Sequence, residues 1–213
     1  QVPPDLNAIS CDAPDAPNNV FYRGEDNISV THRTRNDGGV ASSTYVLEFR
    51  ASTNNIISTG DYQMGSYWYW DSFPAETYST GTYATSVPNV PPGIYYIGAI
   101  VTTDGDAFNG DDLWYNDATY LASTVEIRLP PPSNNWCSSA PAVGLGSTFG
   151  ATAGANTDGS ASCGFSNSTA DVWYAFTAPC TGILAADTCG SSYDTVLSIH
   201  SACAGTTAHW LLL

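Results

Sequence analysis

Apolar and polar residues alternate with a period of two along the first 129 residues of the chain. One such segment, 26–36, places Ile28, Val30, His32 and Thr34 on one face and Ser29, Thr31, Arg33 and Arg35 on the other. Another places Tyr45, Leu47 and Phe49 inward, opposite Val46, Glu48 and Arg50. Because successive side chains of a β-strand point to opposite faces, both segments predict strands with one buried face.

Four more segments continue the pattern, at 64–70, 79–87, 94–101 and 120–129. Turn residues separate them, as in Asn36-Asp37-Gly38-Gly39, where glycine and asparagine tolerate positive φ. About seven short strands with frequent turns predict an immunoglobulin-like β-sandwich for residues 1–129.

A proline-rich stretch at 130–135 predicts a spacer, because consecutive prolines cannot join a sheet ladder. Residues 136–213 predict a second, small β-sandwich with strands at 143–151, 171–177, 182–187 and 194–200. The fold class is therefore all-β, as two tandem sandwich modules. A core this small needs disulfides to offset its shortage of buried apolar area.

Charged residues are only 12% of the chain, and 20 acidic residues against five arginines and no lysine give a net charge of −15. A negative field of this size repels nucleic acid and anionic lipid headgroups, and it attracts divalent cations. Adaptation to saline water would explain the same composition. No apolar run approaches the roughly 20 residues that cross a bilayer. The sequence starts at Gln1 without an apolar leader, which indicates a removed signal peptide or a fragment.

Six cysteines lack the spacing of a zinc or redox C-x-x-C site and predict disulfides in an oxidising compartment, hence an extracellular or cell-surface location. Six cysteines permit 15 pairings. We predict Cys137–Cys163 and Cys180–Cys189, the latter between neighbouring strands. Cys203 is left for a partner beyond the end of the sequence, and Cys11 is either free or takes that role across the modules.

The first module resembles the bacterial cell-adhesion-related (CARDB) domain over residues 4–129. The matching motifs are Pro4-Asp5-Leu6, Asn36-Asp37-Gly38-Gly39, Ser52-Thr53-Asn54-Asn55-Ile56-Ile57 with Gly60-Asp61, the run from Pro91 to Val101, and Asn116-Asp117. It departs from the family in the loop 104–112, where the family usually carries glutamates and a double Asn. The resemblance implies an immunoglobulin-like accessory module of a large extracellular protein.

The second module is similar to a cysteine-rich β-sandwich repeat of secreted bacterial proteins, and distantly to pre-peptidase C-terminal domains. The matching motifs are Asn135-Trp136-Cys137, Thr157-Asp158-Gly159, the run from Asp171 to Cys180, and the run from Cys189 to Ile199. Such repeats continue with another cysteine and an Asn-Asp-Asp segment, so the resemblance implies a module that is truncated at its C-terminal end.

Catalytic motifs are missing from the sequence. There is no G-x-S-x-G or H-E-x-x-H segment, and the acidic residues, which lie mostly in loops, form no pair with assignable acid and base roles. His32 has an inward strand position, which favours a packed or hydrogen-bonded histidine over a catalytic base. We therefore expect no enzyme.

The loop between the last two predicted strands carries many hard oxygen donors: Asp104, Asp106, Asn109, Asp111 and Asp112, with Asn116 and Asp117 beyond. Calcium takes six to eight such ligands, so a calcium ion is a possible cofactor here. The spacing is not that of an EF-hand, and a solvated acidic turn is the simpler interpretation.

In Tyr67-Trp68-Tyr69-Trp70, strand alternation places Trp68 and Trp70 on one face and the two tyrosines on the other. Both faces of an outer strand cannot be core. One aromatic pair could therefore bind a sugar or a protein, unless neighbouring packing covers it or the rings pair across strands.

The function expected from these features is non-catalytic adhesion, binding or spacing in a bacterial surface or secreted protein. The partners would be extracellular macromolecules or glycans. The alternative is a carbohydrate-binding accessory region of a secreted hydrolase. Because fold does not fix function, the adhesion role rests on resemblance and not on a site.

Overall fold

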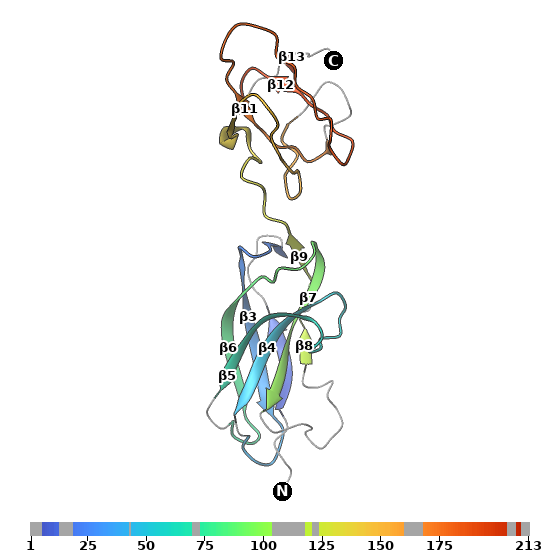
Figure 1. Cartoon of the computed structure of the whole chain (residues 1–213). Coiled ribbons are helices and arrows are strands. Elements are labelled where there is room, and N and C mark those ends of the chain that lie inside the picture. Colours follow the sequence, from blue (N-terminus) through green and yellow to red (C-terminus); the bar gives the residue numbers. More distant parts are fainter. Residues whose placement is uncertain are drawn as a thin grey trace. The chain divides into compact units, whose positions relative to one another are not determined.

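The computed structural model describes residues 6–12, 19–42, 44–69, 73–103, 118–120, 124–159, 168–203 and 208–209. The chain forms two compact units, Gln1–Leu129 and Pro130–Leu213, whose boundary falls at the start of the proline-rich stretch (Figure 1). Among the described residues, no helix is both long and apolar enough to span a bilayer.

The first unit consists of two β-sheets. The smaller sheet has the order β1-β3-β6 and contains β1 (Leu6–Asp12), β3 (Asn27–Asn36) and β6 (Tyr78–Ser86). The larger sheet has the order β2-β9-β7-β4-β5, and β8 also pairs with β7. Its strands are β2 (Val20–Tyr22), β4 (Tyr45–Ser52), β5 (Tyr62–Tyr69), β7 (Gly93–Thr103), β8 (Ala118–Tyr120) and β9 (Val125–Arg128). The all-β class predicted from alternation is confirmed, and β1 and β2 are strands that the pattern did not predict.

The core lies between the two sheets and is built by the alternating residues of the strands. On β3, Ile28, Val30, His32 and Thr34 are all buried, as the sequence pattern predicts. Phe49 of β4 is fully buried among the rings of Tyr67, Tyr83 and His32, with centroid separations of 5.9, 6.2 and 6.3 Å. These ring contacts join β3 and β6 of one sheet to β4 and β5 of the other.

The outward face of β4 is also largely buried, unlike the prediction for Val46, Glu48 and Arg50. The side chains of Val46 and Arg50 are buried and Glu48 is half-buried. The loop 53–61 turns back toward this face. Arg50 donates hydrogen bonds to the carbonyl oxygens of Thr59 and Asp61, and it forms an ion pair with Glu48. The alternation of residues within β4 cannot predict this burial, because the residues that cover the face belong to the loop and not to the strand.

The side chain of Ile57, in this loop, packs against the larger sheet at Gly98 of β7. A Cβ atom on Gly98 would lie 2.5 Å from the carbonyl oxygen of Thr119 and closer still to the Ile57 side chain, which is buried. Such a contact is shorter than any packing allows, so this position requires a glycine.

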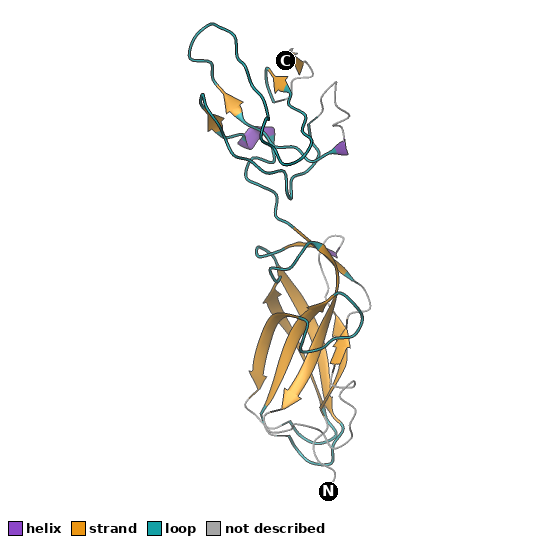
Figure 2. Ribbon diagram, turned by 45° about the vertical axis from the view of Figure 1, so that its right-hand side comes forward, coloured by secondary structure: helices purple, strands orange, loops and turns teal. Residues whose placement is uncertain are grey.

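The second unit consists mostly of loops (Figure 2). Its elements are the short helix η2 (Cys137–Ser139), the parallel pair β10 (Ala142–Val143) and β11 (Ala175–Phe176), and the antiparallel pair β12 (Ile199–His200) and β13 (Ala208–His209). These strands are much shorter than the predicted ones, and the predicted strand 182–187 is not formed. Several of its large apolar side chains are exposed, among them Leu145, Phe149 and Ile183.

Polar contacts hold the second unit together. Asn135 is fully buried, and its Oδ1 accepts the backbone N–H of Asn156 at 2.6 Å. Asn134 and Trp173 are joined through backbone atoms at 2.9 Å, and Oδ2 of Asp171 accepts the backbone N–H of Gly159 at 2.9 Å. Asn135, Gly159, Asp171 and Trp173 belong to the motifs Asn135-Trp136-Cys137, Thr157-Asp158-Gly159 and Asp171-Val172-Trp173, so the motifs serve the structure of this unit.

Candidate binding surface and the predicted sites

The outward face of the smaller sheet is exposed along β3 and β6. We call it the β3–β6 outer face, and it consists of Ser29, Thr31, Arg33 and Arg35 of β3 with Tyr78, Thr80, Thr82, Ala84 and Ser86 of β6. The antiparallel register places Thr31 opposite Thr82 and Arg33 opposite Thr80. The surface is therefore a sheet face of hydroxyl groups, with an arginine and an aromatic ring at one end.

Tyr78 presents an aromatic ring on this face, with 61% of the residue exposed. The guanidinium carbon of Arg33 lies 4.0 Å from the centroid of that ring, a cation–π arrangement. Arg35 forms an ion pair with Asp37 at 2.8 Å, whereas Arg33 has no carboxylate partner among the residues that the structure describes. The Arg33 guanidinium thus keeps its hydrogen-bond donors available to a ligand while the ring fixes its position.

Hydroxyl groups extend the surface from this ring along the two strands. The Oγ1 atoms of Thr31 and Thr82 are 2.7 Å apart and share a hydrogen bond across the strands. Sequence alternation does not identify this surface, because the even and odd positions of 78–86 are similarly polar. Only the pairing with β3 shows which set points outward.

His32 lies on the opposite side of β3 from this surface and is 1% exposed. Its Nδ1 lies 3.1 Å from the Thr34 hydroxyl, and its ring stacks on Tyr83 at 5.5 Å. Burial lowers the pKa of His32 from 6.5 to about 4, because the apolar core disfavours the charged imidazolium. The prediction of a packed, hydrogen-bonded histidine is thus met by its geometry.

A second histidine makes a contact that the sequence did not indicate. Ser198 Oγ and His200 Nε2 are 2.9 Å apart, and the His200 ring lies 5.3 Å from that of Trp173. A serine nucleophile and its histidine base need a third group to orient the ring. Within the described residues of this unit, no carboxylate forms a hydrogen bond or ion pair with His200.

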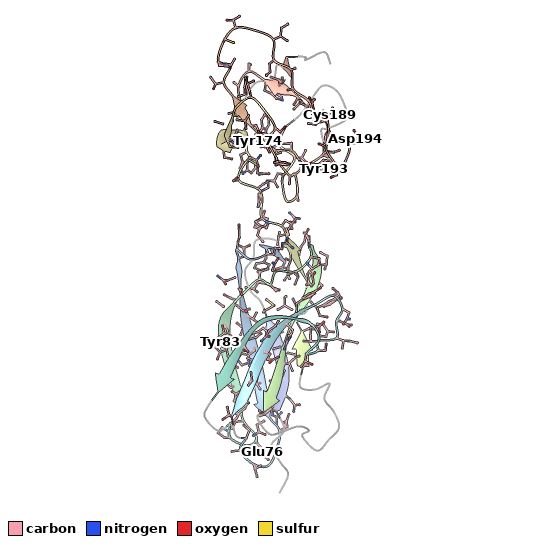
Figure 3. All side chains as sticks on the ribbon, viewed as in Figure 1. Glu76, Tyr83, Tyr174, Cys189, Tyr193 and Asp194 are labelled. Carbon is pink, nitrogen blue, oxygen red and sulfur yellow. A yellow bond between two sulfur atoms is a disulfide. The ribbon has the colours of Figure 1, made fainter. Side chains whose placement is uncertain are left out.

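The predicted disulfides are wrong. Cys137 is bonded to Cys203, with Cα atoms 5.3 Å apart, and not to Cys163. Cys180 and Cys189 are exposed free thiols; the side chain of Cys189 is labelled in Figure 3. The physical reason is that the strand predicted at 182–187, which would have brought these two cysteines together, is not formed. Cys163 lies outside the described residues.

The other predicted sites fall where the structure gives no side chains. Asp104, Asp106, Asn109, Asp111, Asp112 and Trp70 lie outside the described residues, and for Trp68 only the backbone is described. Calcium binding and an exposed tryptophan pair therefore stay predictions. In the part of the chain that is described, no three His, Cys, Asp or Glu side chains are grouped to hold a metal ion.

No protein-family model matches the chain, and no curated protein matches it. Among solved structures it is similar to the CARDB domain of the PF1109 protein from Pyrococcus furiosus, in complex with di-metal ions. The sequence identity is 15%, the match covers 61% of this chain and 97% of that chain, and the TM-score is 0.40. The solution structure of that domain has 17% identity, 60% and 97% coverage and a TM-score of 0.36. A β-glucosidase from Erythrobacter marinus has 13% identity, 58% and 15% coverage and a TM-score of 0.36. Likenesses this low assign neither a family nor a function.

Proposed function

We propose that this chain is a non-catalytic binding segment of an extracellular or cell-surface protein, and that its first unit binds an acidic glycan through the β3–β6 outer face. The observation that carries the proposal is the exposed Tyr78 ring with the Arg33 guanidinium 4.0 Å from its centroid. An aromatic ring stacks on the apolar face of a sugar, and a guanidinium pairs with carboxylate or sulfate groups.

The electrostatics of the chain favour this face as the site for an acidic ligand. The net charge is −15, so a carboxylated or sulfated glycan is repelled by most of the surface. Two of the five arginines lie on the β3–β6 outer face, beside uncharged threonines and serines. The ligand would therefore be directed to this face by attraction here and by repulsion elsewhere.

Two further observations support the non-catalytic and extracellular parts of the proposal. His32 is enclosed in the core with a pKa near 4, where it cannot exchange protons with a substrate. The Cys137–Cys203 disulfide is the kind of bond that persists in an oxidising compartment. The CARDB resemblance of the sequence motifs fits the same role.

The same face would serve a carbohydrate-binding accessory region of a secreted hydrolase, which is the alternative function. The parent protein distinguishes the two. A neighbouring catalytic domain would indicate the accessory region, and a cell-wall anchor would indicate adhesion.

A glycan array that includes uronate-bearing and sulfated polysaccharides tests the proposal. We expect the wild-type chain to bind acidic glycans and Tyr78→Ala to bind them at least about fivefold more weakly, since stacking of a sugar on one aromatic ring is worth about 1 kcal/mol or more. Tyr62→Ala is the matched control, because Tyr62 is 44% exposed but lies on β5 of the other sheet. Wild-type protein that binds no glycan, or equal losses in the two variants, would refute the proposal.

A further inference from the structure

Strand β6 is a long edge strand without charge. Its nine residues, Tyr78–Ser86, contain no proline and no Asp, Glu, Lys, Arg or His, although the chain as a whole carries a net charge of −15. In the described part of the chain β6 pairs only with β3, at one end of the order β1-β3-β6. Its other side therefore presents a row of backbone hydrogen-bonding groups.

The register shows which groups these are. Hydrogen bonds from Val87 N to Asp26 O at 3.0 Å and from Asn36 N to Thr77 O at 2.9 Å fix the two ends of the β3–β6 ladder. In an antiparallel ladder the backbone groups of alternate residues point the same way. The odd-numbered residues of β6 thus bond to β3, and the even-numbered residues point outward.

Part of this edge is already occupied. The carbonyl oxygen of Ala84 accepts a hydrogen bond from the Tyr67 hydroxyl at 2.7 Å, where β5 approaches β6. The outward groups of Tyr78, Thr80 and Thr82 have no partner among the described residues. The free part of the edge is therefore the five residues 78–82, centred on Thr80.

The other edge strands of the first unit carry features that prevent strand addition, and β6 does not. β2 and β8 are three residues long. The pairing of β1 with β3 is interrupted by a bulge between Ala8 and Ser10, and the pairing of β5 with β4 by one between Phe49 and Arg50. Short strands, bulges, prolines and charges are the usual protection of an edge. The register of β3 with β6 is regular over its whole length.

We propose that two copies of this chain form a dimer by pairing β6 with β6 of the second copy, antiparallel about a two-fold axis at Thr80. In this register Thr80 pairs with Thr80 of the second copy, and Tyr78 pairs with Thr82 of the second copy. All outward groups of 78–82 are then paired in about six backbone hydrogen bonds. The two smaller sheets would become one continuous sheet.

The local absence of charge makes this edge the place where a second copy can approach most easily. Two chains that each carry −15 repel one another overall, but β6 itself contributes no charged side chain to that repulsion. At the centre of the pairing the nearest charged residues are the two Arg33 side chains, opposite Thr80 on each β3. The two β3 strands would be three strand spacings apart, so roughly 14 Å separates the two Arg33 residues, more than the Debye length of about 10 Å at 0.1 M salt. The inference does not depend on the glycan proposed above.

Sedimentation equilibrium of the full chain tests the dimer, in a Cys180→Ser, Cys189→Ser background that removes exposed thiols as a source of cross-linking. We expect reversible dimers with a dissociation constant in the micromolar range. Thr80→Pro removes only an outward N–H, and Thr80→Lys places two like charges face to face, so each should weaken the dimer at least about tenfold. Thr80→Val, which keeps the N–H, should leave it intact.

Far-UV circular dichroism of each variant shows whether the sandwich is retained. If Thr80→Pro unfolds, Thr80→Lys provides the comparison, because it leaves the backbone unchanged. Wild-type protein that stays monomeric at several hundred micromolar would overturn the proposal. A dimer that Thr80→Lys leaves at wild-type strength would overturn it as well.

Discussion

Replacing both Cys137 and Cys203 by serine is expected to unfold the second unit and leave the first one folded. The disulfide closes a loop across a sequence separation of 66 residues. On the chain-entropy estimate, a loop of this length is worth about 4 kcal/mol of stability. That is a large part of the roughly 5–15 kcal/mol by which a whole domain is stable.

The second unit has little to replace this bond. Its described residues that are buried are polar, Asn134 and Asn135, whereas Leu145, Phe149 and Ile183 are exposed. Hydrogen bonds alone contribute about 1 kcal/mol each. Limited proteolysis with mass spectrometry should find new cleavage sites between 137 and 203 in the variant, with the first unit protected.

The control for this experiment is Cys180→Ser with Cys189→Ser, which removes two free thiols and no bond. It should retain the wild-type cleavage pattern. Mass mapping of the oxidised protein should find the Cys137–Cys203 peptide pair. Finding Cys137 joined to Cys163 instead, or a double serine variant as resistant as the wild type, would contradict the structure.

Acidification from pH 6.5 to pH 4 is expected to cost the first unit about 3 kcal/mol through His32 alone. The fold lowers the pKa of His32 from 6.5 to about 4 because burial disfavours the imidazolium. The unfolded chain therefore binds this proton first as the pH falls. The stabilisation is fully present above about pH 6.5 and is lost as the pH approaches 4.

Urea denaturation at several pH values measures this loss, with far-UV circular dichroism reporting on the long strands of the first unit. Carboxylates also titrate in this range, so the comparison is with His32→Leu, which keeps every carboxylate. The variant is expected to be less stable at pH 7, because Thr34 Oγ1 loses the Nδ1 partner that lies at 3.1 Å. Its stability should nevertheless fall by about 3 kcal/mol less between pH 6.5 and 4. Parallel curves for the two proteins would show that His32 is not buried as neutral imidazole.

Local alternation predicted the parts of the fold that depend on local geometry. On β3 the inward set and the outward set are those that the sequence pattern gives, because one register places every second side chain in the core. The outward face of β4 was predicted less well. Arg50 and Val46 are buried there, because the loop 53–61, which directly follows β4, folds back over this face and its carbonyl oxygens accept hydrogen bonds from Arg50.

The second unit shows a different reason for failure. Its predicted strands and its disulfides were inferred from short motifs, but those motifs contain the polar residues that bond loops to one another, as Asn135 does with Asn156. Cysteine pairing depends on spatial proximity, which sequence order did not reveal for Cys137 and Cys203. The candidate surface was missed because nothing in 78–86 separates its two faces until β3 pairs with it.

Residue-resolved amide hydrogen exchange along β6 tests the register on which both the binding face and the free edge depend. In the monomeric Thr80→Lys protein, the amides of odd-numbered residues from 79 to 85 should exchange slowly, because they bond to β3. The amides of residues 78, 80 and 82 should exchange rapidly, since they point away from it. Equal protection at odd and even positions, or the reverse alternation, would contradict this arrangement of the sheet.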